Sequence, residues 1–166
     1  MKKLIVLAVL SLLVVSSAFA AEGDIKLPAP EKTGGIGVLD VVAARQSVGD
    51  FADTELTPEQ LSTLLWVAGG INRDNGKLTY ATAFNIQDMI IFVFMKSGTY
   101  RYEPSAHTLA LVAEGDNRKL TGGQPFVAKA AVDLLYIQDA GKWASLSRKT
   151  PPEVMETDTP MKTPRA

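Results

Sequence analysis

The sequence predicts one α+β domain, and three observations support this fold class. Two segments with helical periodicity come first along the chain. Apolar runs typical of strands follow them, so helices and strands occupy separate parts of the sequence. The length of 166 residues suits one domain that buries about two-thirds of its unfolded surface.

The first 20 residues have the pattern of a cleavable secretory signal peptide. Lys2 and Lys3 precede an apolar run over residues 4 to 15, and Ala18-Phe19-Ala20 supplies the small residues of a cleavage site. An uncleaved anchor is the alternative, but the run is shorter than the roughly 20 residues that cross a bilayer. We therefore expect cleavage after Ala20 and a secreted or periplasmic protein that is not held in the membrane.

The composition excludes several classes of function. Basic residues number 17 and acidic residues 18, and no basic cluster is interleaved with aromatic residues, so no nucleic-acid partner is predicted. Cysteine is absent, which excludes disulfides and thiolate chemistry. One histidine, His107, cannot by itself build a metal site or a serine-histidine triad, so we expect it to be a turn residue.

Residues 21 to 37 are rich in proline, glycine and charged residues, and they predict an extended lead-in without visible chemistry. Residues 38 to 44 carry apolar side chains at helical spacing and predict a short helix. A second helix begins at Thr57-Pro58, because threonine can cap it, proline suits its first position, and Gln60 completes a capping box. Its buried face and its glycine end are formed by Leu61, Leu64, Leu65 and Ala68, followed by Gly69 and Gly70.

The strands are predicted from residue 90 onward. Residues 90 to 95 are continuously apolar, which indicates a central strand. Residues 99 to 102 and 108 to 112 read as a hairpin in which Tyr100 and Tyr102 share one face. Residues 130 to 137 give a further strand. Residues 143 to 166 are rich in proline and charge, so a disordered tail is expected in place of a final helical layer.

Several short motifs occur in one order along the chain. They are Arg45-Gln46-Ser47-Val48-Gly49-Asp50-Phe51, the Leu-Leu-Trp-Val-Ala-Gly-Gly-Ile-Asn-Arg stretch over 64 to 73, Thr82-Ala83-Phe84-Asn85-Ile86-Gln87-Asp88, the hairpin from Gly98 to Tyr102, and Gly115-Asp116-Asn117-Arg118. Together these motifs resemble the nitroreductase family over residues 38 to 140. The resemblance implies a central, mostly antiparallel sheet with flanking helices in an intertwined homodimer.

The resemblance also implies a flavin site. It implies flavin mononucleotide (FMN) at the subunit interface and electrons from NADH or NADPH. By position, Arg45, Gln46 and Ser47 would contact the flavin phosphate and ribityl chain, where a forked cation and short donors suit an anion. Asn85 would face the pyrimidine edge of the ring, because an amide both donates and accepts hydrogen bonds. We expect these groups to form one concave pocket. The alternative is that Arg45 satisfies carbonyls at the C-terminal end of a helix and that Asn85 caps a short helix.

Two departures from the family pattern bear on activity. Gly49 stands where a basic residue is usual, and Ala81 stands where proline is common, so weaker phosphate binding is expected. The helix that follows the last strand in the family has no counterpart. We therefore expect an incomplete nitroreductase-like domain over residues 38 to 142, truncated or frameshifted at its C-terminus, with the apolar strand faces at 90 to 94 and 132 to 136 exposed.

Three functions remain open at this stage. The first is an FMN-dependent oxidoreductase that reduces nitro or quinone-like small molecules by hydride transfer, without a catalytic protein side chain, since the flavin carries the chemistry. The second is an inactive truncated remnant that does not retain FMN. The third is a small extracytoplasmic binding module. Export would place the protein where reduced nicotinamide is scarce, so an unusual electron donor is also expected.

Overall fold

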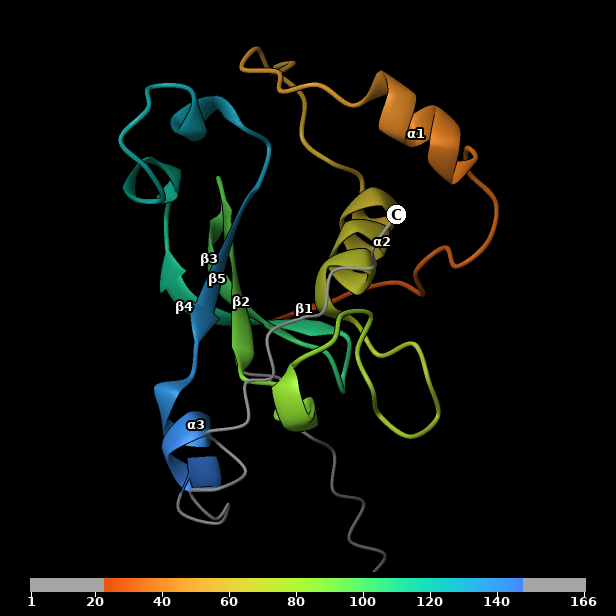
Figure 1. Ribbon diagram of the computed structural model, residues 1–166. Helices are drawn as coiled ribbons and strands as arrows, with labels where there is room; N and C mark the ends of the chain where they lie inside the picture. The colour runs from red at the N-terminus through yellow and green to blue at the C-terminus, as the bar shows by residue number, and fades with distance from the viewer. Residues whose placement is uncertain (1–22, 148–166) are drawn as a thin grey trace, which may run out of the picture.

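The computed structural model describes residues 23–147. The predicted signal peptide and residues 148 to 166 of the predicted tail lie outside the described residues. The described chain forms a five-stranded antiparallel sheet in the order β1-β4-β3-β2-β5, with helix α2 on one face (Figure 1). The predicted α+β class is confirmed. Its elements are β1 Ile25–Lys26, α1 Val38–Ala44, α2 Pro58–Gly69, η1 Ala83–Asn85, β2 Met89–Met95, β3 Gly98–Glu103, β4 Thr108–Glu114, η2 Arg118–Leu120, η3 Val127–Lys129, β5 Asp133–Gln138 and α3 Ala140–Ser147.

The apolar run predicted as a central strand is β2, which pairs with β3 on one side and β5 on the other. Val93 lies opposite Tyr100 in β3 and opposite Leu134 in β5. The hairpin prediction is also confirmed, and Tyr100 and Tyr102 are both buried on the same face.

Helix α2 begins as predicted. The Thr57 hydroxyl accepts a hydrogen bond from the Gln60 amide, and the Gln60 side chain accepts one from the Thr57 amide, which completes the capping box. Leu61 and Leu65 pack against the sheet, whereas Leu64, predicted on the same face, is 37% exposed. The helix ends at Gly69.

Gly70 follows the end of this helix, and close contact with Trp66, not a left-handed backbone, explains the glycine. Its φ is −77°, which any residue adopts. A Cβ at this position would lie 2.7 Å from the Cα of Trp66 and 2.5 Å from the Trp66 Cδ1 atom. Glycine is required here because the chain turns back against the preceding helical turn.

The two faces of the sheet differ in burial. Side chains of a strand alternate between faces, and Ile91 and Val93 of β2 point into the core against α2. The opposite face carries Ile90, Phe92 and Phe94 of β2 with Leu135 and Ile137 of β5, and the last two are 37% and 43% exposed. Exposure was predicted for residues 132 to 136, but Val132 and Leu134 pack against the core, so only part of that strand is uncovered.

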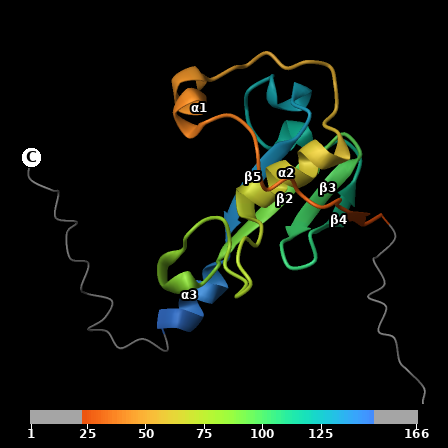
Figure 2. The same ribbon diagram turned by 90° about the vertical axis from the view of Figure 1, so that its right-hand side faces the viewer.

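Helix α1 has the predicted bounds but no buried residue. In Figures 1 and 2 it stands away from the sheet, and its apolar side chains face solvent in the single chain. The exposed fractions of Val38, Leu39 and Val42 lie between 66% and 80%. A helix this short and apolar is not stable on its own, so α1 requires a surface to pack on.

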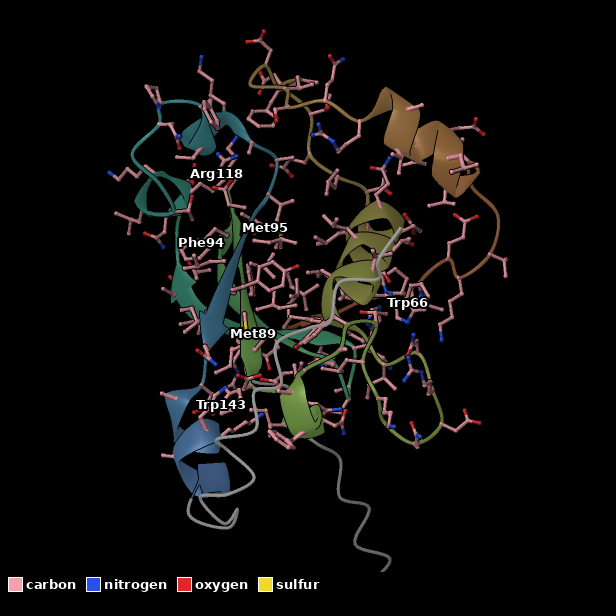
Figure 3. The ribbon with its side chains drawn as sticks, in the orientation of Figure 1. Trp66, Met89, Phe94, Met95, Arg118 and Trp143 are labelled. Carbon is pink, nitrogen blue, oxygen red and sulfur yellow. The ribbon has the colours of Figure 1, made fainter. Side chains whose placement is uncertain are left out.

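At the C-terminal end, the structure corrects a predicted boundary. Residues 143 to 147 belong to helix α3, not to a tail that begins at residue 143. Figure 3 shows Trp143 projecting from α3 toward the start of β2. Within residues 23–147, no helix combines the length and hydrophobicity that crossing a bilayer would require.

Candidate functional site

The predicted phosphate-binding segment directly follows α1. Arg45 occupies the C-cap position with extended backbone, and Gln46 and Ser47 continue in an exposed loop. Within the described part of the chain, none of these three side chains makes a hydrogen bond or ion pair. The reading of Arg45 as a cation that satisfies the last carbonyls of α1 therefore has no hydrogen bond to support it.

Asn85 ends the short helix η1 in an unusual backbone. Phe84, Asn85 and Gln87 all have positive φ, between 49° and 53°. Asparagine tolerates this left-handed region, but a bulky residue such as Phe84 rarely adopts it. Strained backbone of this kind concentrates at binding sites, so the 84–87 segment is a candidate site on structural grounds that the sequence pattern did not provide.

Two hydrogen bonds hold this strained segment in place. The Gln87 amide donates to the Thr82 hydroxyl at 3.0 Å, and the Gln87 side chain donates to the Gly76 carbonyl at 3.0 Å. Gln87 therefore anchors the loop. The Asn85 side chain makes no hydrogen bond among the described residues and caps no helix, so its amide faces solvent.

The two parts of the predicted site lie far apart in the single chain. The segment after α1 lies at one end of the molecule, whereas η1, the short lime-green helix, lies at the other end beyond α2 (Figures 1 and 2). None of the four predicted residues is among the lining residues of four of the best-formed cavities in the described chain. The described single chain therefore does not bring Arg45 and Asn85 together, and the prediction that they share one concave pocket stays a prediction.

A cavity of about 600 Å³ lies elsewhere. It opens between the loop over residues 51 to 55 and the η2–η3 segment, beyond the end of β2 that carries Met95 (Figure 3). Its charged lining residues are Asp53, Glu55, Lys96, Arg118 and Lys129.

Arg118, from the Gly-Asp-x-Arg turn, is held rigidly in the wall of this cavity. It forms an ion pair with Asp116 at 2.6 Å and donates to the Ala130 carbonyl. The hydrogen bond from Arg118 lowers the pKa of Asp116 to about 2. Because its guanidinium N–H groups already bind Asp116 and the Ala130 carbonyl, Arg118 stabilises the η2–η3 loop and has few donors left for a ligand.

One contact between aromatic side chains beside this cavity was not predicted from the sequence. Phe51 and Phe126 lie with ring centroids 6.2 Å apart and join the loop after Arg45 to the η2–η3 segment. No pattern in either segment signals this contact, because the two residues are distant in sequence. Within the described residues, no group of acidic or histidine side chains is arranged to hold a metal ion.

A second cavity, of about 340 Å³, lies near the start of β2 between the loop over residues 71 to 80 and β3. Tyr80 and Arg101 are among its lining residues, with Lys142 of α3. Burial, reinforced by the charge of Asp88, raises the pKa of the Tyr80 hydroxyl. Tyr80 therefore stays protonated and donates to the Met89 carbonyl at 3.4 Å.

Comparison with known proteins places these features in a family context. The sequence profile described as the Nitroreductase family matches residues 42–162. A Methanocaldococcus jannaschii protein, provisionally named a nitroreductase, is 28% identical over 122 residues, covering 68% of this chain and 60% of the relative.

A crystal structure of a Ralstonia eutropha JMP134 protein, also provisionally named a nitroreductase, superposes with a TM-score of 0.68 at 34% identity. The match covers 81% of this chain and 62% of that structure. The present chain thus spans about three-fifths of the length of each of these relatives.

Proposed function

Because the chain belongs to the nitroreductase family, we propose that it acts as an FMN-dependent oxidoreductase that reduces nitro or quinone-like small molecules. One observation carries the proposal. The side chains at the family's flavin positions, Arg45, Gln46, Ser47 and Asn85, are exposed and have no partner within the described chain.

The chemistry of these side chains fits the cofactor. The Arg45 guanidinium and the Ser47 hydroxyl can donate to a phosphate, and an arginine-phosphate pair forms two parallel, charge-assisted hydrogen bonds. The Asn85 amide can donate and accept at the edge of a flavin ring. When bound, FMN supplies the hydride chemistry, so the protein has to bind, orient and shield it.

The distance between the two ends of the site favours a homodimer. In one chain the Arg45 segment and η1 lie at opposite ends, so a single copy does not enclose a flavin. Helix α1 carries apolar side chains that are exposed in the single chain. We infer that a second copy packs on α1 and places its own Asn85 near Arg45 of the first, so that each flavin site takes residues from both subunits.

We also propose that the protein acts outside the cytoplasm, as the signal-peptide pattern at residues 1 to 20 suggests. Reduced nicotinamide is scarce there. We therefore expect an unusual electron donor in place of NADH or NADPH, and oxidation of NADH or NADPH by the purified protein at ordinary rates would contradict this expectation.

Titration with FMN tests the cofactor assignment. The purified chain, after incubation with FMN and removal of free flavin, should be yellow and should quench flavin fluorescence at one FMN per subunit. Arg45→Ala should weaken binding tenfold or more, because a charge-assisted contact is lost. The control is Lys26→Ala, which removes an exposed cation from β1. Colourless protein would contradict the proposal and favour an inactive remnant.

Subunit complementation tests the shared site. Arg45→Ala and Asn85→Ala proteins, each deficient in FMN binding, are mixed, unfolded and refolded together. If sites are shared, each mixed dimer contains one site with both native residues, and FMN binding returns to about a quarter of the sites in the mixture. A site within one chain would give no recovery, which would overturn the dimer proposal and leave the cofactor proposal intact.

A further inference from the structure

The N-terminal segment, predicted as a lead-in without chemistry, is fastened to the fold at several points. We name residues 23 to 33 the strap. Strand β1 within it pairs with β4 through Ile25 and Lys26. The Asp24 carboxylate accepts a hydrogen bond from the Leu111 amide at 2.8 Å, and Leu27 is buried in the core. The strap therefore covers the edge of β4.

The centre of this attachment is a partly buried chain of hydrogen bonds through His107. Its Nδ1 atom lies 2.8 Å from the Tyr102 hydroxyl, and its Nε2 atom lies 2.7 Å from the Ser62 hydroxyl. The Ser62 hydroxyl in turn donates to the Pro28 carbonyl of the strap at 2.7 Å. The His107 carbonyl also accepts from the Leu27 amide at 3.3 Å. His107 is thus a turn residue, as predicted, but it also joins β3, α2 and the strap.

The direction of these bonds requires a neutral imidazole. Ser62 has one hydroxyl proton, which it donates to Pro28, so it must accept from the Nε2 proton of His107. Nδ1 is then unprotonated and accepts the Tyr102 proton. Ser62 is fully buried and Tyr102 is 3% exposed, so neither can turn to water if the ring gains a second proton. A protonated ring would leave the Tyr102 proton without its acceptor and would place a charge in a partly buried site.

From this geometry we propose that the strap is an acid-released latch, closed over β4 and α2 while His107 is neutral and opened when His107 is protonated. Opening would bare the β4 edge and the pocket of Leu27, a surface able to accept an extended strand.

The groups around the ring set the pH range. The strap contributes Lys32, β3 contributes Tyr102, whose pKa is raised to about 12 by burial, and α2 contributes the neutral Ser62 hydroxyl. Burial, followed by the charge of Lys32, lowers the pKa of His107 below its ordinary value of 6.5, although the Pro28 carbonyl opposes this shift. A lowered pKa favours the neutral ring, so the latch is fully closed above pH 6.5 and opens as the pH falls below it.

The strap's own contact with Trp66 provides the readout. The Lys32 ammonium lies 5.6 Å from the centre of the Trp66 ring. Because the chain has no native cysteine, Lys32→Cys can be labelled with bimane, a dye that nearby tryptophan quenches. Burial still lowers the pKa of His107 when the Lys32 charge is absent, because it is the largest cause of the shift. In a Trp143→Phe background, fluorescence should therefore be low at pH 7.5 and should rise in one step below pH 6.5, with the open fraction growing up to tenfold per pH unit for one bound proton.

Two variants test whether protonation of His107 opens the strap. His107→Asn keeps a side chain that tolerates the positive φ of 51° at this turn but cannot be protonated, so the step should disappear. Tyr102→Phe removes the donor that favours the neutral ring, so the step should move to higher pH. A step that persists in His107→Asn would overturn the proposal. So would circular dichroism showing that the sheet unfolds in the same pH range, since the change would then be global.

Discussion

Gly49 lies four residues after Arg45, where a basic residue is usual in the family this chain belongs to. The structure leaves room for one. A Cβ at Gly49 would have the Phe126 ring as its nearest neighbour, at 4.0 Å, an ordinary contact. The missing cation is therefore a difference in chemistry, and no backbone constraint at this position requires glycine.

We expect Gly49→Arg to tighten FMN binding by about 10- to 100-fold. A second charge-assisted contact to the phosphate contributes roughly 1.5 to 3 kcal/mol. Fluorescence titration of FMN at low and high salt measures the change, which should shrink as salt rises. Gly123→Arg is the matched control, because a Cβ there also meets open space. Equal gains in both variants would indicate a general effect of charge.

Phe84 illustrates strain at a single residue. It holds a φ of 52° although its side chain is 63% exposed, so packing does not explain the conformation. Left-handed backbone costs a non-glycine residue about 1 to 2 kcal/mol, and glycine loses about 0.5 to 1 kcal/mol in added chain entropy.

Phe84→Gly should therefore raise the free energy of unfolding by about 0.5 to 1 kcal/mol in urea titrations. Phe84→Ala is the control, since it removes the ring but keeps the strain, and it should give no gain. If the alanine variant stabilises as much as glycine, the exposed ring and not the backbone is responsible. A loss of FMN affinity in the glycine variant would show that the strained loop serves binding.

At the scale of elements, α3 is held by the buried carboxylate of Asp88 and by a hydrogen bond from Lys142 to the Gln87 carbonyl at 2.6 Å. Asp88 is 4% exposed and accepts from the Gln138 side chain at 2.8 Å and from the Trp143 indole at 2.5 Å. These bonds, led by that of Gln138, together with the charge of Lys142, lower the pKa of Asp88. The attachment of α3 to the start of β2 therefore depends on an ionised Asp88.

Asp88→Ala should release α3 while the sheet stays folded. In a Trp66→Phe background, the emission of Trp143 should shift to longer wavelength, and amides of residues 140 to 147 should exchange faster. In the native chain the same change should occur only below pH 3.8, because a lowered pKa keeps the carboxylate ionised above that value. Asp74→Ala, in an exposed loop, should change neither signal. An unchanged Trp143 spectrum in Asp88→Ala would contradict this role.

At the scale of the whole molecule, the uncovered face of the sheet is the surface of the described chain that most favours aggregation. Strand β5 is an edge strand that pairs with β2 alone, and its outer face exposes Leu135 and Ile137. An apolar edge with unpaired backbone groups is a template for association. This surface follows from the same pairing that makes β2 central.

Ile137→Lys should slow aggregation several-fold at neutral pH, because a charge on an edge strand disfavours strand addition. Light scattering over time at fixed concentration measures the rate. Leu120→Lys is the control, since it replaces another exposed apolar residue, 71% exposed, away from the sheet. If both variants slow aggregation equally, added charge and not the edge is the cause.

Local patterns determined the elements of this protein. The Thr57-Gln60 capping box, the apolar run of β2 and the tyrosine hairpin each act within a few residues, so sequence alone predicted their positions and the family. Tertiary structure decided what distant residues do together. It showed that His107 joins the strap to α2, that α3 is ordered through Asp88, and that Arg45 and Asn85 do not meet within one chain. Such contacts depend on how separated segments pack, and no local spacing encodes that packing.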